Sequence, residues 1–158
     1  MRAAIAPLFA IAALAFTTSP VEAGTDTAQL TVTATVQSGC SVSGGTLDFG
    51  TYIAGQVDDL DGVTQITLTN CAGTVTIELD GGQYGSVADR KMANGSARLQ
   101  YQLYRDPSRT QIWGQGNNAY QGQILVDNAV LEVFGRIPGG QNVTPGTYTD
   151  IVNITVTF

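Results

Sequence analysis

The chain contains no histidine and only two cysteines. Without histidine it lacks the commonest general base and the Ser/His and Cys/His pairs of nucleophilic catalysis. Two cysteines without a histidine also offer too few soft ligands for a metal site. Together with the lack of any other catalytic motif, these absences indicate a protein that is not an enzyme and that uses no cofactor.

Charge is scarce as well, and basic charge most of all. Charged residues make up 13% of the chain, against about 25% in typical soluble domains. The net charge of −6 argues against nucleic-acid binding and against attraction to anionic membranes. Threonine, glutamine, asparagine and serine cover the surface instead, as suits an exported β-protein.

Long hydrophobic runs are limited to the first residues. Arg2 precedes an apolar run over residues 3–16, and Val21-Glu22-Ala23 resembles a small-residue cleavage site. The run is too short for a membrane span, which takes about 20 apolar residues. We therefore expect residues 1–23 to be a cleavable signal peptide, and the mature chain to be exported as one domain without a membrane span.

Export would place both cysteines, Cys40 and Cys71, in an oxidising compartment. We expect them to form a disulfide. For a loop of this length, the chain-entropy model gives a stabilisation of about 3.5 to 4 kcal/mol.

Residues 28–37 alternate strictly between apolar and polar side chains. One face of the expected strand carries four apolar residues, namely Leu30, Val32, Ala34 and Val36. Such a period of two is typical of a half-buried strand. A strand at a free N-terminus must pair with something or become an aggregation hazard. On pattern alone it is either the first strand of a complete sandwich or a strand donated to another chain.

The rest of the chain shows short strand-like runs and no helical period of useful length. We expect strands over residues 40–49, 63–69, 74–79, 99–106, 130–137 and 147–158. Asn94-Gly95 predicts a two-residue hairpin turn, and residues 52–62 and 114–122 read as loops. Many short strands with turn signals between them predict an antiparallel sandwich or barrel. A disulfide near a sheet edge favours the immunoglobulin-like sandwich.

Two groups of residues suggest binding sites only weakly. Asp58, Asp59 and Asp61 hint at a calcium loop, but Thr64 stands where that loop needs glycine, so a solvated loop is expected. Four aromatic residues could stack on a carbohydrate, namely Tyr101, Tyr104, Trp113 and Tyr120. Core or edge packing is the favoured interpretation of these rings, since each buries a large apolar area.

Several short motifs occur in a fixed order along the mature chain. They are residues 38–42 (SGCSV), 47–50 (LDFG), 68–71 (LTNC), 79–82 (LDGG), 90–92 (RKM), 99–106 (LQYQLYRD), 134–138 (FGRIP) and 146–150 (GTYTD). Together they resemble the spore coat protein U domain family. That family includes the major pilins of archaic (Csu-type) chaperone–usher pili and is related to the FanG fimbrial group.

The resemblance implies an all-β fold, an incomplete immunoglobulin-like antiparallel β-sandwich that is completed by a donor strand from another chain. It implies that residues 24–39 are a donor-strand extension and residues 40–158 the sandwich domain. Leu30, Val32, Ala34 and Val36 would fill a neighbour's groove. A periplasmic chaperone would grip the last strand through four residues, Val152, Ile154, Val156 and Phe158.

The function implied is that of an exported pilin. Its partners would be identical or related pilin subunits, a periplasmic chaperone and an outer-membrane usher. It would pass through the periplasm into a cell-surface fibre (a fimbrium) that supports adhesion and biofilm formation. The alternatives are a secreted spore-coat-like or cell-surface coat protein, and a surface-binding adhesin module.

Overall fold

The structure, a computed structural model, describes residues 25–36 and 39–158. The expected signal peptide and two residues of the extension, Gln37 and Ser38, lie outside the described residues. The chain divides after Thr35 into two units. Residues 25–36 contain no strand, so the strand expected over 28–37 is not present as such. Among the described residues, no helix is long and apolar enough to cross a membrane.

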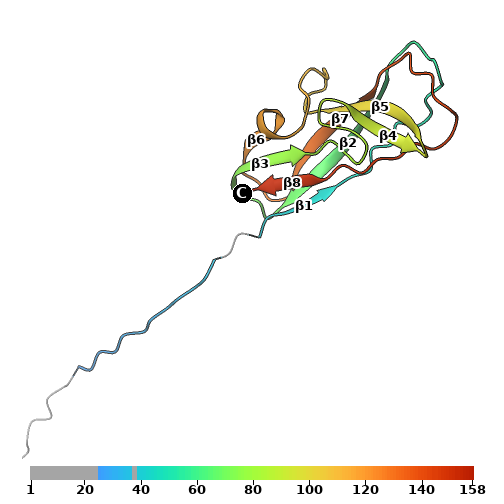
Figure 1. The fold of residues 1–158 in the computed structure, drawn as a ribbon. Coiled ribbons are helices and arrows are strands. Elements are labelled where there is room, and N and C mark those ends of the chain that lie inside the picture. The colour runs from blue at the N-terminus through green and yellow to red at the C-terminus, as the bar shows by residue number, and fades with distance from the viewer. Residues whose placement is uncertain (1–24, 37–38) are drawn as a thin grey trace, which may run out of the picture. The chain divides into compact units, whose positions relative to one another are not determined.

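The described residues form two antiparallel sheets (Figure 1). In spatial order, the five-stranded sheet contains β1 (Ser41–Gly44), β2 (Leu60–Thr69), β7 (Ala129–Ile137), β5 (Ala97–Tyr104) and β4 (Arg90–Asn94). The three-stranded sheet contains β6 (Tyr120–Ile124), β3 (Gly73–Leu79) and β8 (Ile154–Thr157). A single 3₁₀ turn, Gly116–Asn118, is the only helical element among the described residues. The all-β prediction is therefore confirmed.

The core lies between the two sheets and follows from the alternation of the strands. In β2, Ile66 and Leu68 point inward and are buried, and Ile77 does the same in β3. Burial of such a side chain contributes about 1.5 to 3 kcal/mol. Trp113 is buried as well, and its indole N–H donates a 3.0 Å hydrogen bond to the Ile77 carbonyl oxygen.

Two of the four aromatic residues that could have stacked on a carbohydrate belong to this core. Trp113 and Tyr101 are buried, and Tyr120 packs against the core with its ring centroid 5.9 Å from that of Trp113. Core packing was therefore the correct interpretation of Tyr101, Trp113 and Tyr120, whereas Tyr104 is half-buried outside the core cluster.

A two-residue hairpin turn joins β4 to β5, but its central residues are Gly95 and Ser96 and not Asn94 and Gly95 as predicted, because Asn94 is the last residue of β4. Asn94 pairs with Ala97, and Gly95 has φ = 57°, a left-handed value that glycine adopts at no steric cost. The turn pairs Arg90–Asn94 with the first half of β5.

Two loop predictions and two strand predictions were wrong in their bounds. Residues 60–62, at the end of the predicted loop 52–62, are the start of β2. Residues 120–122 belong to β6 and not to a loop, because β6 pairs with β3 from Tyr120↔Ile77 to Ile124↔Gly73. The run 40–49 forms a strand only over Ser41–Gly44. The run 147–158 forms a strand only over Ile154–Thr157. The two shortened strands, β1 and β8, border the same groove.

Candidate functional site

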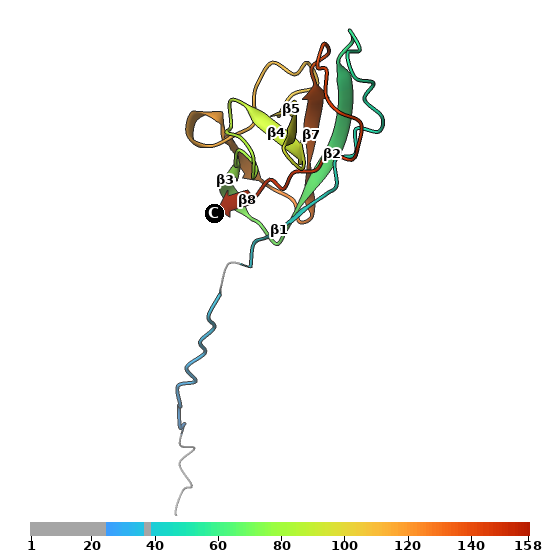
Figure 2. The same ribbon diagram turned by 45° about the vertical axis from the view of Figure 1, so that its right-hand side comes forward.

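A groove opens between the two sheets, between residues 45–49, which follow the edge strand β1, and residues 148–154, which lead into the edge strand β8. The two strands lie side by side in both views (Figures 1 and 2). The groove leads to a cavity of about 400 Å³. The cavity floor consists of core side chains from both sheets, among them Ile66, Leu79, Leu103 and Val133.

The groove has an unpaired backbone on both sides. Within the described residues β1 pairs only with β2, and β8 pairs only with β3. Each strand therefore presents a free edge of N–H and C=O groups beside exposed apolar surface. An open edge next to apolar pockets is the geometry that binds an added strand.

Residues 45–49 form one border of the groove after β1 ends. Gly62 of β2 stands opposite Gly135 of β7, and these two glycines make room for Leu47 and Phe49. A Cβ added at Gly135 would lie 2.5 Å from Leu47 Cδ2 and 2.7 Å from Phe49 Cζ, closer than side chains tolerate. The glycine pair thus lets this border pack flat on the sheet.

Residues 148–153 form the other border. A backbone bridge between Thr149 and Ala93 of β4 anchors them, and side-chain hydrogen bonds hold the rest of the segment. The Tyr101 hydroxyl donates to Asp150 Oδ2 at 2.6 Å. Asp150 Oδ1 accepts from the backbone N–H of Gln83 at 2.8 Å. Asp80 accepts from both the backbone N–H and the side-chain amide of Asn153, at 3.0 and 2.6 Å.

These contacts shift the pKa values of two of the groups that form them, Tyr101 and Asp80. Burial raises the pKa of Tyr101, and the hydrogen bond to Asp150 raises it further, so its hydroxyl remains a donor. Burial tends to raise the pKa of Asp80, but the hydrogen bonds from Asn153 and Gly82 outweigh it and hold that pKa below its usual value. The border is therefore held by an ionised carboxylate and a protonated phenol.

A buried arginine supports the same border from beneath. Arg90 is fully buried and donates to the carbonyl oxygens of Leu79, Asp80 and Trp113 and to the side chain of Gln102. Every buried side-chain nitrogen or oxygen in the described part of the chain has a partner. The Arg90 side chain therefore links β4 to the end of β3, next to the hydrogen bonds between Asp80 and Asn153.

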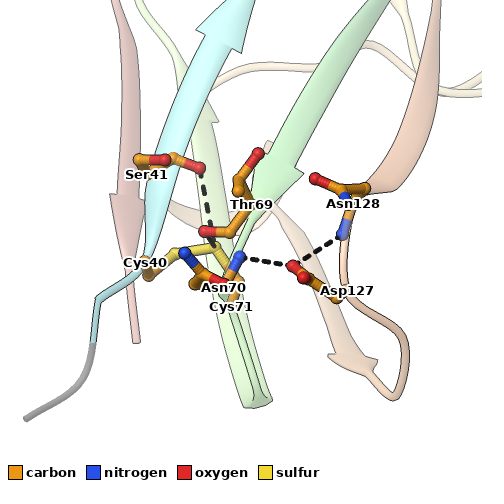
Figure 3. The surroundings of a disulfide bond; sticks show 7 residues. All are labelled: Cys40, Ser41, Thr69, Asn70, Cys71, Asp127 and Asn128. Carbon is orange, nitrogen blue, oxygen red and sulfur yellow. Dashed lines mark hydrogen bonds between the residues drawn. A yellow bond between two sulfur atoms is a disulfide. The ribbon is translucent and has the colours of Figure 1, made fainter.

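The predicted disulfide is confirmed. Cys40, just before β1, is bonded to Cys71, between β2 and β3, with their Cα atoms 4.2 Å apart (Figure 3). Beside it, Asp127 Oδ1 accepts from the backbone N–H of Asn70 at 2.7 Å. The disulfide holds β1 at this end of the sandwich, and the hydrogen bond between Asp127 and Asn70 holds the β6–β7 turn at the same end.

The residues predicted for the donor strand and those predicted to contact the chaperone differ in their solvent exposure. The side chains of Leu30, Val32, Ala34 and Val36 are exposed. Val152, Ile154 and Val156 are half-buried against the core, and the first two of these line the groove, whereas Phe158 is exposed. Sequence reasoning missed the groove borders, although the LDFG and GTYTD motifs mark them both.

The acidic residues just before and at the start of β2 make ion pairs. Asp61 accepts from Arg136 Nε at 2.8 Å, and Asp59 lies 3.2 Å from the same guanidinium. The Arg136 hydrogen bond holds the pKa of Asp61 below its usual value, in spite of partial burial. No cluster of three or more potential metal ligands occurs among the residues that the structure describes.

The fold and groove define a class: an immunoglobulin-like β-sandwich with one open edge groove. The chain belongs to the Spore Coat Protein U domain family, which matches residues 26–155. Protein U of Myxococcus xanthus is 38% identical to it over 181 residues, which cover 100% of this chain and 98% of that protein. The family predicted from the motifs is confirmed.

A solved structure with a similar fold is known. One similar chain comes from the chaperone–tip adhesion subunit pre-assembly complex of the archaic chaperone–usher Csu pili of Acinetobacter baumannii. Its TM-score is 0.53 at 20% identity, and the match covers 75% of this chain and 39% of that one. This chain thus spans less than half of that chain. A chain of another chaperone–usher pilus has a TM-score of 0.48 at 18% identity, over 88% of this chain and 99% of its own length.

Proposed function

We propose that the protein is an exported pilin that assembles into surface fibres by donor-strand exchange. Residues 24–39 of one copy would be the donating extension, and residues 40–158 of the next copy the accepting domain. The observation that carries this proposal is the apolar groove between the segment that follows edge strand β1 and the segment that leads into edge strand β8, in a chain whose own residues 28–37 alternate apolar and polar.

The energetics of the groove favour an inserted strand. Burying Leu30, Val32 and Val36 contributes about 1.5 to 3 kcal/mol each, and Ala34 contributes less. Main-chain hydrogen bonds to the free edge add to this, while side-chain pockets select the register. Because the groove would be filled only by another chain, the stability of the domain would depend on its partner.

The register of the donor strand follows from the requirement that its apolar side chains face the groove. We assign the donor antiparallel to β8 and the residues that lead into it, because these residues line the groove and antiparallel pairing is the more stable arrangement. Residues directly opposite in such a pair share a face, and a slip of one residue would turn the apolar face outward. The register that pairs all of 28–37 with 149–158 sets Leu30 opposite Val156, Val32 opposite Ile154, Ala34 opposite Val152 and Val36 opposite Asp150.

The partners follow from the same groove. Before assembly, a periplasmic chaperone would supply the missing strand and grip Val152–Phe158, and an outer-membrane usher would exchange it for the next subunit's extension. The structural likeness to a chain of a chaperone–subunit pre-assembly complex supports this route. The protein would thus pass through the periplasm to a cell-surface fibre, with a role in adhesion and biofilm formation.

A secreted coat protein is the second candidate. The observation that favours it is the 38% identity to Protein U of Myxococcus xanthus over the whole chain, within a family named for a spore coat. A coat protein could use the same groove to join subunits, so the two candidates differ in the shape and location of the polymer. The adhesin alternative loses support because Tyr101 and Trp113 are buried.

The test compares two single substitutions in the full exported chain. Val32→Asp places a charge on the apolar face of the extension, and Thr33→Asp places it on the polar face of the same strand. Unboiled parent protein should give SDS-resistant ladders, Thr33→Asp should retain them, and Val32→Asp should lose at least nine-tenths of them. Equal ladders from both variants would rule out donor-strand exchange. Electron microscopy of the surface material then separates fibres from a coat.

A further inference from the structure

The turn between β6 and β7 exposes two consecutive apolar side chains. Leu125 is 80% and Val126 is 64% exposed. The backbone behind them is held firmly, because Asp127 Oδ1 accepts from the N–H groups of Asn70 and Asn128 at 2.7 and 2.9 Å (Figure 3). A fixed turn that presents apolar side chains to solvent is typical of an interaction surface.

This turn lies at the end of the domain from which the N-terminal extension departs. Asn70, which binds Asp127, is next to Cys71, and Cys71 is bonded to Cys40 (Figure 3). Whatever receives the extension must therefore approach the turn as well.

Chain length limits how far the receiving subunit can be. In the proposed register Val36 of the donor lies opposite Asp150 of the acceptor. Four residue steps separate Val36 from Cys40, and four steps span at most about 14 Å. The neighbouring residue on that border, Ile151, is 59% exposed. The donor's disulfide end must therefore lie close to an exposed apolar residue of the acceptor.

We propose that Leu125 and Val126 of each donor subunit pack against the groove border of the next subunit around Ile151. The partner is a second copy of this chain, and the inference rests on the proposed donor-strand exchange. The contact would orient successive domains in the polymer, whereas the inserted strand by itself only links them.

The test places one cysteine on each side of the proposed contact. A full-length chain carrying Val126→Cys and Ile151→Cys is exported, allowed to polymerise, oxidised mildly and boiled in SDS without reductant. We expect a covalent ladder that reductant removes. The matched control pairs Val126→Cys with Val63→Cys, a site on β2 that is 50% exposed and outside the contact. It should give at least tenfold less ladder.

Each outcome bears on the proposal. SDS-resistant polymers in unboiled samples without a covalent ladder, or an equal ladder from the control pair, would overturn the contact and leave donor-strand exchange intact. A parent chain that forms no polymer would overturn both. A second variant, Leu125→Ser with Val126→Ser, should still polymerise but give polymers with a persistence length at least twofold shorter. An unchanged persistence length would contradict the contact.

Discussion

The Tyr101 hydroxyl donates a 2.6 Å hydrogen bond to Asp150 and so joins the floor of the groove to its border. Tyr101 belongs to β5 in the five-stranded sheet, whereas Asp150 leads into β8 of the other sheet. The bond therefore fixes the separation of the sheets at the place where the sandwich is open.

Tyr101→Phe should loosen this border. The substitution removes the donor to a charged acceptor, and hydrogen bonds of this kind contribute about 1.5 to 3 kcal/mol. We expect a loss near the lower value in urea denaturation, because Asp150 retains its backbone donors. Tyr104→Phe is the control, since the Tyr104 hydroxyl makes no side-chain hydrogen bond within the described residues. Equal stability of the two variants would show that the Tyr101 bond does not hold the border.

Acid should weaken the domain through Asp80. Its pKa in the folded state is lowered, so its stabilising contribution is complete above the unfolded value of about 3.9. That contribution is lost as the pH falls through the lower folded value. The free energy of unfolding, measured from pH 6 to pH 2.5, should fall more steeply below about pH 4 in the parent than in Asp80→Asn. Parallel curves would contradict this role.

Alternation and turn chemistry were enough to predict much of the fold. β2, β3 and β7 bury every second residue, so their sequences carry the period of two. Local chemistry also predicted the disulfide and the hairpin between β4 and β5, although the turn lies one residue later than predicted. β6 was missed because glycine and glutamine occupy most of its positions, and only its pairing with β3 makes it a strand.

The groove was harder to predict because its borders depend on distant partners. Leu47 and Phe49 pack over a glycine pair on two other strands, which no local pattern reveals. Arg90 looks like a surface residue in the sequence, yet carbonyl oxygens from two separate segments surround it. The run 147–158 was predicted as one strand, but within the described residues its first half has only an isolated bridge between Thr149 and Ala93, and side-chain bonds hold the rest of it.

Removal of the disulfide should destabilise the domain strongly. The bond closes a separation of 31 residues, for which the chain-entropy model gives about 3.5 to 4 kcal/mol. The double variant Cys40→Ser with Cys71→Ser should show this loss in denaturant and a much lower periplasmic yield, because unfolded chains are exposed to proteolysis. A periplasmic yield and stability equal to those of the parent would show that the bond contributes little.

Truncation tests the last strand as the chaperone's contact. Deleting Thr155–Phe158 removes most of β8 and its pairing with β3. Recovery from the periplasm should be lost even with the chaperone co-expressed. Thr157→Ser, which preserves the strand, should be recovered normally. Normal recovery of the truncated protein would instead make this strand an ordinary part of the sandwich.

The most direct test of donor-strand exchange uses a protein that accepts a strand and cannot donate one. Deleting residues 24–37 should stop polymerisation and leave a monomer of reduced stability. A synthetic peptide of residues 28–37 should then raise the melting temperature of that monomer, because the peptide binds only the folded state. The Thr33→Asp peptide should act similarly and the Val32→Asp peptide should not. A deleted protein that is as stable as the parent and ignores the peptide would contradict the account.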